Sequence, residues 1–152
     1  MNVFIASSWK QRTRVRALAV SLRSAGHEVY DFTDPACREQ PEIPPERFPD
    51  AFDPVHHVYR EYIQAVPEWR GAIEGNRRAL ERCDLVVLLL PAGNDAHSDW
   101  AYAVGAGKRS LVVGHPNAGD RTPSHMWASD GFVDSDNLVA KALGERKEGG
   151  NG

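Results

Sequence analysis

The run Leu85–Leu90 constrains the fold of this chain more than any other feature of the sequence. Its six residues, Leu-Val-Val-Leu-Leu-Leu, are all apolar and do not alternate with polar residues. A strand with one face in water alternates apolar and polar residues, whereas a strand covered by helices on both faces is apolar throughout. The run therefore predicts a central strand of a parallel sheet, which is the core of an α/β protein.

A strand–helix–strand unit precedes this run. Val3–Ala6 is a short apolar segment, and apolar residues then recur at helical spacing from Thr13 to Ala25. Gly26 is placed to end this helix, and His27–Phe32 has the composition of a second strand. Two parallel strands joined by a helix form a right-handed crossover. We therefore expect a doubly wound, Rossmann-like or flavodoxin-like, parallel sheet of four to five strands in a single domain.

The remaining segments fit the same architecture. Further helices are predicted at Val55–Val66, Glu68–Arg82, Asp99–Gly107 and Asn137–Leu143, and further strands at Ser110–Val113 and around Val133. A Pro-rich loop occupies residues 34–54, and loops of this length are typically lids, binding loops or partner arms. We expect one domain over residues 1–144 and a flexible tail over residues 145–152.

Composition excludes several classes of protein. The chain has 152 residues, with 18 Lys and Arg against 21 Asp and Glu, so a broad nucleic-acid-binding face is not expected. No stretch reaches the roughly 18 apolar residues of a membrane span, and the first residues lack the pattern of a signal peptide. The two cysteines, Cys37 and Cys83, are typical of a reducing compartment. These features predict a cytoplasmic protein with neither a nucleic-acid polymer nor a membrane as its partner.

Candidate functional residues follow the predicted strands, because ligands of such sheets bind outside the carboxyl ends of the strands. Three segments meet there: Ser7–Lys10, Asp31–Phe32 and Pro91–Asp99. The first contains neither the P-loop pattern nor the dinucleotide fingerprint. It could hold a phosphate, or it could be no more than a capped helix start. The histidines and cysteines lack the spacing of metal ligands, so no metal site is predicted.

The third segment carries the main candidate for chemistry. Ser98 is predicted to be the N-cap of a helix and Asp99 its first residue, where the helix dipole keeps a carboxylate ionised. An ionised acid could act as a nucleophile or stabilise an oxocarbenium-like centre. The alternative is that Asp99 only charges the first turn, as many acids at that position do.

Cys83–Pro91 followed by Gly93–Lys108 resembles the nucleoside 2-deoxyribosyltransferase superfamily. There, an acidic residue opens a helix with the pattern acid-x-Gly-x-Ala-x-x-x-Gly-Lys, after a buried strand and a glycine-containing turn. The chain is especially similar to a bacterial and phage branch whose turn reads Gly-x-Ser-Ala-His-x-Glu. Val3–Trp9 and Gly26–Phe32 also match that branch, so the resemblance extends from Val3 to about Leu143.

The resemblance implies cleavage or transfer at the N-glycosidic bond of a nucleoside or nucleoside 5′-phosphate. Asp99 takes the place of the nucleophile. No cofactor or metal is implied, the substrate is a small molecule, and the site lies near the interface of a homodimer. The candidate substrate-binding residues, from the strand ends and the resemblance together, are Phe4, Ser7, Ser8, Trp9, Asp31, Asn76, Gly93, Asn94, His97, Ser98 and Met126. Met126 and Trp127 are the residues expected to reach a neighbouring subunit's site.

Three residues depart from the superfamily pattern. The nucleophile is normally Glu, so Asp99 is one methylene shorter; Phe4 stands where a tyrosine hydroxyl normally holds that acid; and Asn76 replaces an aspartate. These changes indicate a shifted substrate or lost catalysis. The alternatives to an N-glycosidase are a catalytically silent nucleotide-binding module, an NAD hydrolase like Toll/interleukin-receptor domains, and a protein-interaction domain without a small ligand.

Overall fold

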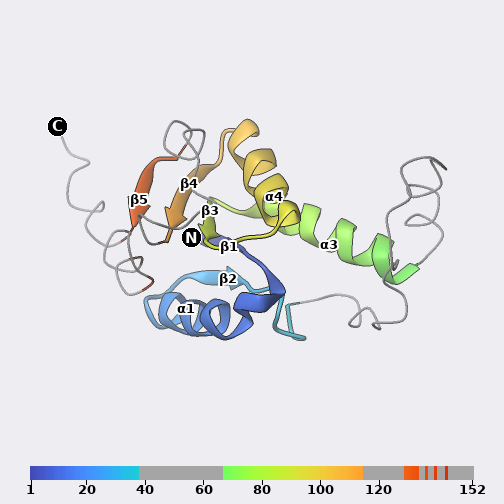
Figure 1. Ribbon diagram of the computed structural model, residues 1–152, viewed down its shortest axis with the longest axis horizontal. Coiled ribbons are helices and arrows are strands. Elements are labelled where there is room, and N and C mark those ends of the chain that lie inside the picture. The colour runs from blue at the N-terminus through green and yellow to red at the C-terminus, as the bar shows by residue number, and fades with distance from the viewer. Residues whose placement is uncertain (38–66, 115–128, 134–135, 137–138, 140–142, 144–152) are drawn as a thin grey trace.

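A parallel sheet organises the chain in the computed structural model, which describes residues 1–37, 67–114, 129–133, 136, 139 and 143 (Figure 1). Within these residues the sheet has five strands in the order β2-β1-β3-β4-β5, all parallel. The strands are β1 (Asn2–Ala6), β2 (Glu28–Tyr30), β3 (Leu85–Leu89), β4 (Arg109–Val113) and β5 (Gly131–Val133). The predicted α/β class, with a doubly wound parallel sheet of four to five strands, is confirmed.

The apolar run is the central strand that the sequence predicts. All five residues of β3 are buried, and the strand pairs with β1 on one side and β4 on the other. Pairing continues just past the strand, where the Leu90 amide donates to the Val113 carbonyl at 2.7 Å. The backbone segments after β3 and β4 approach closely here, since a Cβ on Gly114 would lie 2.8 Å from Cβ of Leu90. Only glycine fits at that position without a shift of the backbone.

Helices cover both faces of the sheet (Figure 1). The helix α1 (Arg12–Ser24) packs on one face, and α3 (Pro67–Arg82) and α4 (Asn94–Gly105) pack on the other. Because successive residues of a strand point to opposite faces, β1 supplies Val3 and Ile5 to the α1 side and Phe4 and Ala6 to the α3/α4 side. The site residues on these elements are therefore carried by a rigid scaffold.

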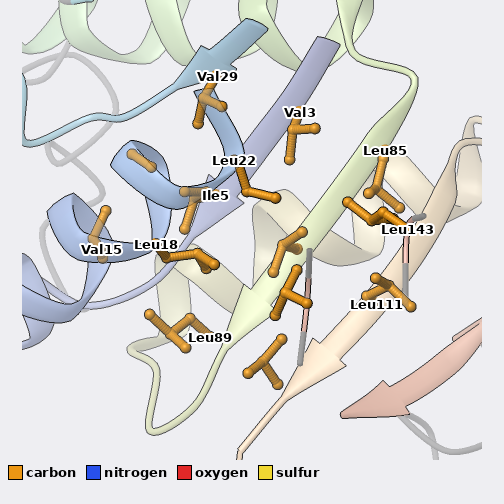
Figure 2. Packing of buried hydrophobic residues seen from close by; sticks show 14 of the residues in the cluster. Val3, Ile5, Val15, Leu18, Leu22, Val29, Leu85, Leu89, Leu111 and Leu143 are labelled. Carbon is orange, nitrogen blue, oxygen red and sulfur yellow. The ribbon is translucent and has the colours of Figure 1, made fainter. Parts of the chain in front are cut away.

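The α1 face shows how the helical spacing produces the core. Val15, Leu18, Ala19 and Leu22 form one apolar stripe and are at most 1% exposed. Figure 2 shows this stripe packing against Val3, Ile5 and residues of the neighbouring strands. Gly26 follows the helix with φ of 84°, and the His27 amide donates to the Leu22 carbonyl, as in a glycine-terminated helix.

The second strand is shorter than the sequence predicts. The second strand was predicted over His27–Phe32, but β2 ends at Tyr30 because the next residues form a turn. The predicted Val55–Val66 helix, the Pro-rich loop beyond Cys37 and the 145–152 tail lie outside the described residues. In the described part of the chain, no helix combines the length and the apolar character needed to cross a membrane.

Candidate functional site

The neighbouring strands β1 and β3 define the place where a ligand can bind. The chain leaves β1 toward α1 on one face and leaves β3 toward α4 on the other. Such a divergence is the topological switch point of an open α/β sheet, where ligands bind outside the carboxyl ends of the strands. The segments that follow β1, β2 and β3 therefore all lie at the carboxyl end of the sheet, as the sequence predicts.

Ser7 and Ser8 follow β1 directly. The Ser7 hydroxyl donates to the Leu89 carbonyl at 2.9 Å and so bridges the ends of β1 and β3. The Ser8 hydroxyl accepts from the Lys10 amide at 3.3 Å and caps the short 3-10 turn η1 (Trp9–Gln11). Both serines lie at the predicted carboxyl end of the sheet, and each makes a hydrogen bond within the fold. Their role as substrate-binding residues stays a prediction.

Trp9 and Asp31 stand beside the serines in different environments. The Trp9 ring is 42% exposed and meets Phe32 edge-on, with ring centroids 5.4 Å apart. Asp31 is 1% exposed, and its Oδ1 accepts from the backbone amide and the hydroxyl of Thr33 at 2.8 and 2.7 Å. Asp31 therefore forms the buried turn that ends β2, and this turn is the physical reason for the shorter strand.

The start of α4 corrects the prediction made for Ser98 and Asp99. The helix begins at Asn94, with Gly93 as its N-cap in extended backbone conformation. Ser98 is inside the helix, and its hydroxyl donates to the Asn94 carbonyl at 3.0 Å. The predictions that Ser98 is the N-cap and that Asp99 is the first helical residue are therefore wrong. Asp99 lies in the second turn, beyond the strongest effect of the helix dipole.

The electrostatics of Asp99 also differ from the prediction. The side chain is half-buried, and its desolvation, reinforced by the charge of Asp95 one turn earlier, raises its pKa from 3.8 to about 6. Among the described residues, no hydrogen bond or ion pair reaches this carboxyl group. The expectation of an acid held ionised by the helix dipole is wrong. Asp99 is instead an acid that changes charge near neutral pH, as groups in functional sites often do.

The other described residues of this segment precede Asp99 at the start of α4. Gly93 and Asn94 are exposed at the beginning of the helix, and His97 is half-buried in its first turns, with its amide donating to the Gly93 carbonyl at 3.1 Å. Met126, together with Trp127, lies outside the described residues. In the part of the chain that the structure describes, no three His, Cys, Asp or Glu side chains gather as metal ligands would.

Phe4 and Asn76 are joined through a residue that the sequence analysis missed, Tyr30. The Phe4 and Tyr30 rings are stacked with centroids 5.1 Å apart and planes 11° apart. The Tyr30 hydroxyl then donates to Oδ1 of Asn76 on α3 at 2.9 Å. The signal available in the sequence was the position of Tyr30 in β2, which places it opposite Phe4 in the ladder.

Arg14 was also missed, since the sequence shows it only as one of several arginines on a helix. Its Nη1 donates to the Leu90 carbonyl at 2.8 Å, just past the end of β3. Its Nε and Nη2 bind the carboxylate of Asp136 at 3.0 and 2.7 Å. This two-pronged ion pair fixes the chain leaving β3 relative to α1.

The fold of this chain has counterparts among solved structures. No protein-family model and no curated protein matches the sequence. Among solved structures, the chain is similar to the CMP N-glycosidase BcmB of Clostridium botulinum, with a TM-score of 0.56 and 16% sequence identity. The likeness covers 96% of this chain and 99% of that chain. At this identity it establishes a shared fold, which extends over nearly the whole of both chains.

Proposed function

We propose that this protein cleaves the N-glycosidic bond of a nucleoside 5′-phosphate or nucleoside, with Asp99 as the acid that acts at C1′. The observation that carries the proposal is the Asp99 carboxyl group, half-buried and without a partner among the described residues, on the helix that follows the central strand. The similarity to a CMP N-glycosidase favours a pyrimidine nucleoside 5′-monophosphate as the substrate.

The reaction needs Asp99 in its carboxylate form. One carboxylate oxygen bonds to C1′ or stabilises an oxocarbenium-like centre there, while the C1′–N bond breaks and its electron pair leaves with the base. The base takes up a proton. Water then attacks C1′, losing a proton and releasing Asp99, which gives the free sugar or sugar 5-phosphate; an incoming base in place of water gives transfer.

Half-burial of Asp99 suits this chemistry. A carboxylate that has lost part of its water shell interacts more strongly with positive charge developing on the sugar. The same burial disfavours the charged form below about pH 6, so the protein is expected to act above that pH. Asp99 is shorter than the usual Glu, and α4 must hold it closer to C1′ to compensate.

We further propose membership of the nucleoside 2-deoxyribosyltransferase superfamily and a homodimer that completes the site. The residue patterns of the first and third strand ends support the first proposal, and the likeness in fold to a nucleotide-cleaving enzyme supports it further. Sedimentation equilibrium tests the second, and a monomer that cleaves substrate at full rate would contradict it.

A catalytically silent nucleotide-binding module is the second candidate. The observation that favours it is Phe4, which is 1% exposed and stacked on Tyr30, so that its position offers no hydroxyl to hold an acid. Such a module would bind a nucleotide and leave it intact.

The test measures release of free base from a panel of nucleosides, their 5′-phosphates and NAD. We expect wild-type protein to release base from at least one nucleotide, and Asp99→Asn to lower that rate on the order of a hundredfold or more. Glu28→Gln is the control, because it neutralises an exposed acid at the amino end of β2, away from the carboxyl end of the sheet.

Three outcomes separate the candidates. Release of base from a nucleotide that depends on Asp99 supports the N-glycosidase. Release of nicotinamide from NAD alone would favour the NAD hydrolase. No release from any compound, with ligand binding unchanged in Asp99→Asn, would refute the proposed function.

A further inference from the structure

The sheet face beneath α3 carries a polar pair, Tyr30 and Asn76. Tyr30 is the last residue of β2, and Asn76 lies on α3, 46 residues later in the chain. The Tyr30 hydroxyl donates to Oδ1 of Asn76 at 2.9 Å, and both side chains are half-buried. Tyr30 pairs with Phe4, which in turn pairs with Val86, so the polar pair lies level with the middle of β1, on the face of the sheet that α3 and α4 cover.

Packing fixes the Tyr30 ring independently of its hydroxyl. The ring stacks on Phe4, which is 1% exposed and occupies the partner position in the ladder between β1 and β2. A Cβ on Gly75 would lie 3.9 Å from the Tyr30 hydroxyl oxygen, an ordinary van der Waals distance, so the hydroxyl lies beside the turn of α3 that carries Asn76. The hydroxyl is therefore held against α3 and directed at Asn76.

This bond determines what Asn76 can offer to a ligand. A side-chain amide is planar, with an acceptor oxygen on one side and two N–H donors on the other. Since Oδ1 accepts from Tyr30, the donors of Nδ2 are directed away from the tyrosine. Among the described residues, Nδ2 has no other partner. The pair thus presents a hydrogen-bond donor in a fixed direction on the face of the sheet that also carries α4, the helix of Asp99.

We propose that Tyr30 is a positioning residue of the candidate site, which acts by holding Asn76 so that Nδ2 donates to the departing base. The inference rests on the proposed N-glycosidase function. As the C1′–N bond breaks, its electron pair moves into the base, and the negative charge that develops there on a carbonyl oxygen or ring nitrogen is stabilised by the donor. The substrate class is therefore a nucleotide whose base carries an acceptor at this point.

The experiment is a double-mutant cycle with Tyr30→Phe, Asn76→Ala and the double variant, measured on the nucleotide that the wild-type protein cleaves fastest. Tyr30→Phe keeps the ring that stacks on Phe4, and alanine is favourable in a helix, so both variants should fold. Ser24→Ala, which removes an exposed hydroxyl at the last residue of α1, is the control. Thermal unfolding is measured for every variant.

We expect each single variant to lower kcat about tenfold with a smaller change in KM, because the donor acts on charge that develops in the transition state. The double variant should fall no further than Asn76→Ala, because the role inferred for Tyr30 is to hold Asn76. Ser24→Ala should match the wild type.

Two results overturn the inference while leaving the proposed function intact. One is an additive loss in the double variant, and the other is a Tyr30→Phe variant that unfolds at a lower temperature but keeps the wild-type kcat. Wild-type protein that cleaves no nucleoside or nucleotide is a different result: it refutes the proposed function before any variant is measured, and this inference falls with it.

Discussion

Asp99 differs from the other acidic residues whose contacts the structure describes. Asp34 accepts from the Ala36 amide and pairs with Arg23, and these contacts lower its pKa. Asp84 accepts from the Asn2 amide, and Asp136 binds Arg14. Such acids stabilise the fold through their contacts. Asp99 has its pKa raised by burial and by Asp95, so its charge costs stability, which is the pattern of a functional acid.

The pH dependence of the rate follows from this shift. The proposed mechanism needs Asp99 as a carboxylate, so it predicts that kcat/KM rises with pH through about 6 and then levels off. Asp95→Asn removes one cause of the raised pKa, so the rising limb should move to lower pH while the plateau rate stays. The measurement is a pH–rate profile of both proteins. A limb that does not move in Asp95→Asn would show that another group controls it.

The stability of Asp99→Asn tests the same shift without any substrate. The pKa of Asp99 is about 6 in the folded protein and 3.8 ordinarily, so the folded state binds the proton more tightly. Stability is therefore lost as pH rises from about 4 through about 6, and the loss is complete above that range. Asparagine has no charge to bury.

We expect Asp99→Asn to be more stable than the wild type by roughly 1–2 kcal/mol at about pH 8, a value reduced to allow for solvent screening, and equally stable below about pH 4. Urea unfolding at the two pH values measures the difference. Glu28→Gln, which changes an exposed acid, should stay within about 0.5 kcal/mol of the wild type at both. An equal effect of Asp99→Asn at both pH values would contradict the raised pKa.

At the scale of helices and strands, the sequence predicted what hydrophobic periodicity encodes. The apolar run Leu85–Leu90 and the apolar stripe of α1 are the residues that the fold buries. Their spacing therefore predicted where β3 and α1 form. The start of α4 was misplaced because Gly93, Asn94 and Ser98 are all residue types that begin helices. Gly93 caps the helix, and Ser98 is accommodated inside it by a bond back to Asn94.

The contacts of the candidate site were harder to predict than its location. The site lies at the carboxyl end of the sheet, and its position there follows from the order of the strands. That order is implied by the strand–helix–strand connections. The bond from Tyr30 to Asn76 and the ion pair of Arg14 with Asp136 join residues 46 and 122 positions apart. Such contacts depend on packing in three dimensions and leave no periodic trace in the sequence.

The helix α1 offers a matched test of the core. Leu22 is fully buried against the sheet, whereas Val20, on the same helix, is 61% exposed. Leu22→Ala should lower the free energy of unfolding by about 2–5 kcal/mol, because it removes buried methyl groups and leaves a cavity. Val20→Ala should be neutral or slightly stabilising, since alanine favours the helix. Urea titration of both variants checks this, and equal losses would contradict the assigned face of α1.

For the molecule as a whole, the likeness to a CMP N-glycosidase is a likeness of the backbone fold. Two chains with 16% identity share a fold over nearly their entire lengths, so the sheet and its helices are compatible with very different side chains. Function is determined by the residues placed at the edge of such a framework. The net charge of −3 also suits a small ligand held by local contacts rather than an extended polyanion.

Ligand-dependent stability distinguishes the remaining candidates for the whole protein. A ligand that binds only the folded state raises the free energy of unfolding by about 2.7 kcal/mol at a hundred times its Kd. We expect CMP to raise the unfolding temperature of Asp99→Asn and to do so persistently, because this variant should consume CMP far more slowly than the wild type. With the wild-type protein the same shift should decay as free cytosine accumulates, and cytidine in place of CMP tests whether the 5′-phosphate is needed.

A persistent shift in both proteins with no free base would favour the silent binding module, and no shift with any nucleotide or nucleoside would favour a protein-interaction domain.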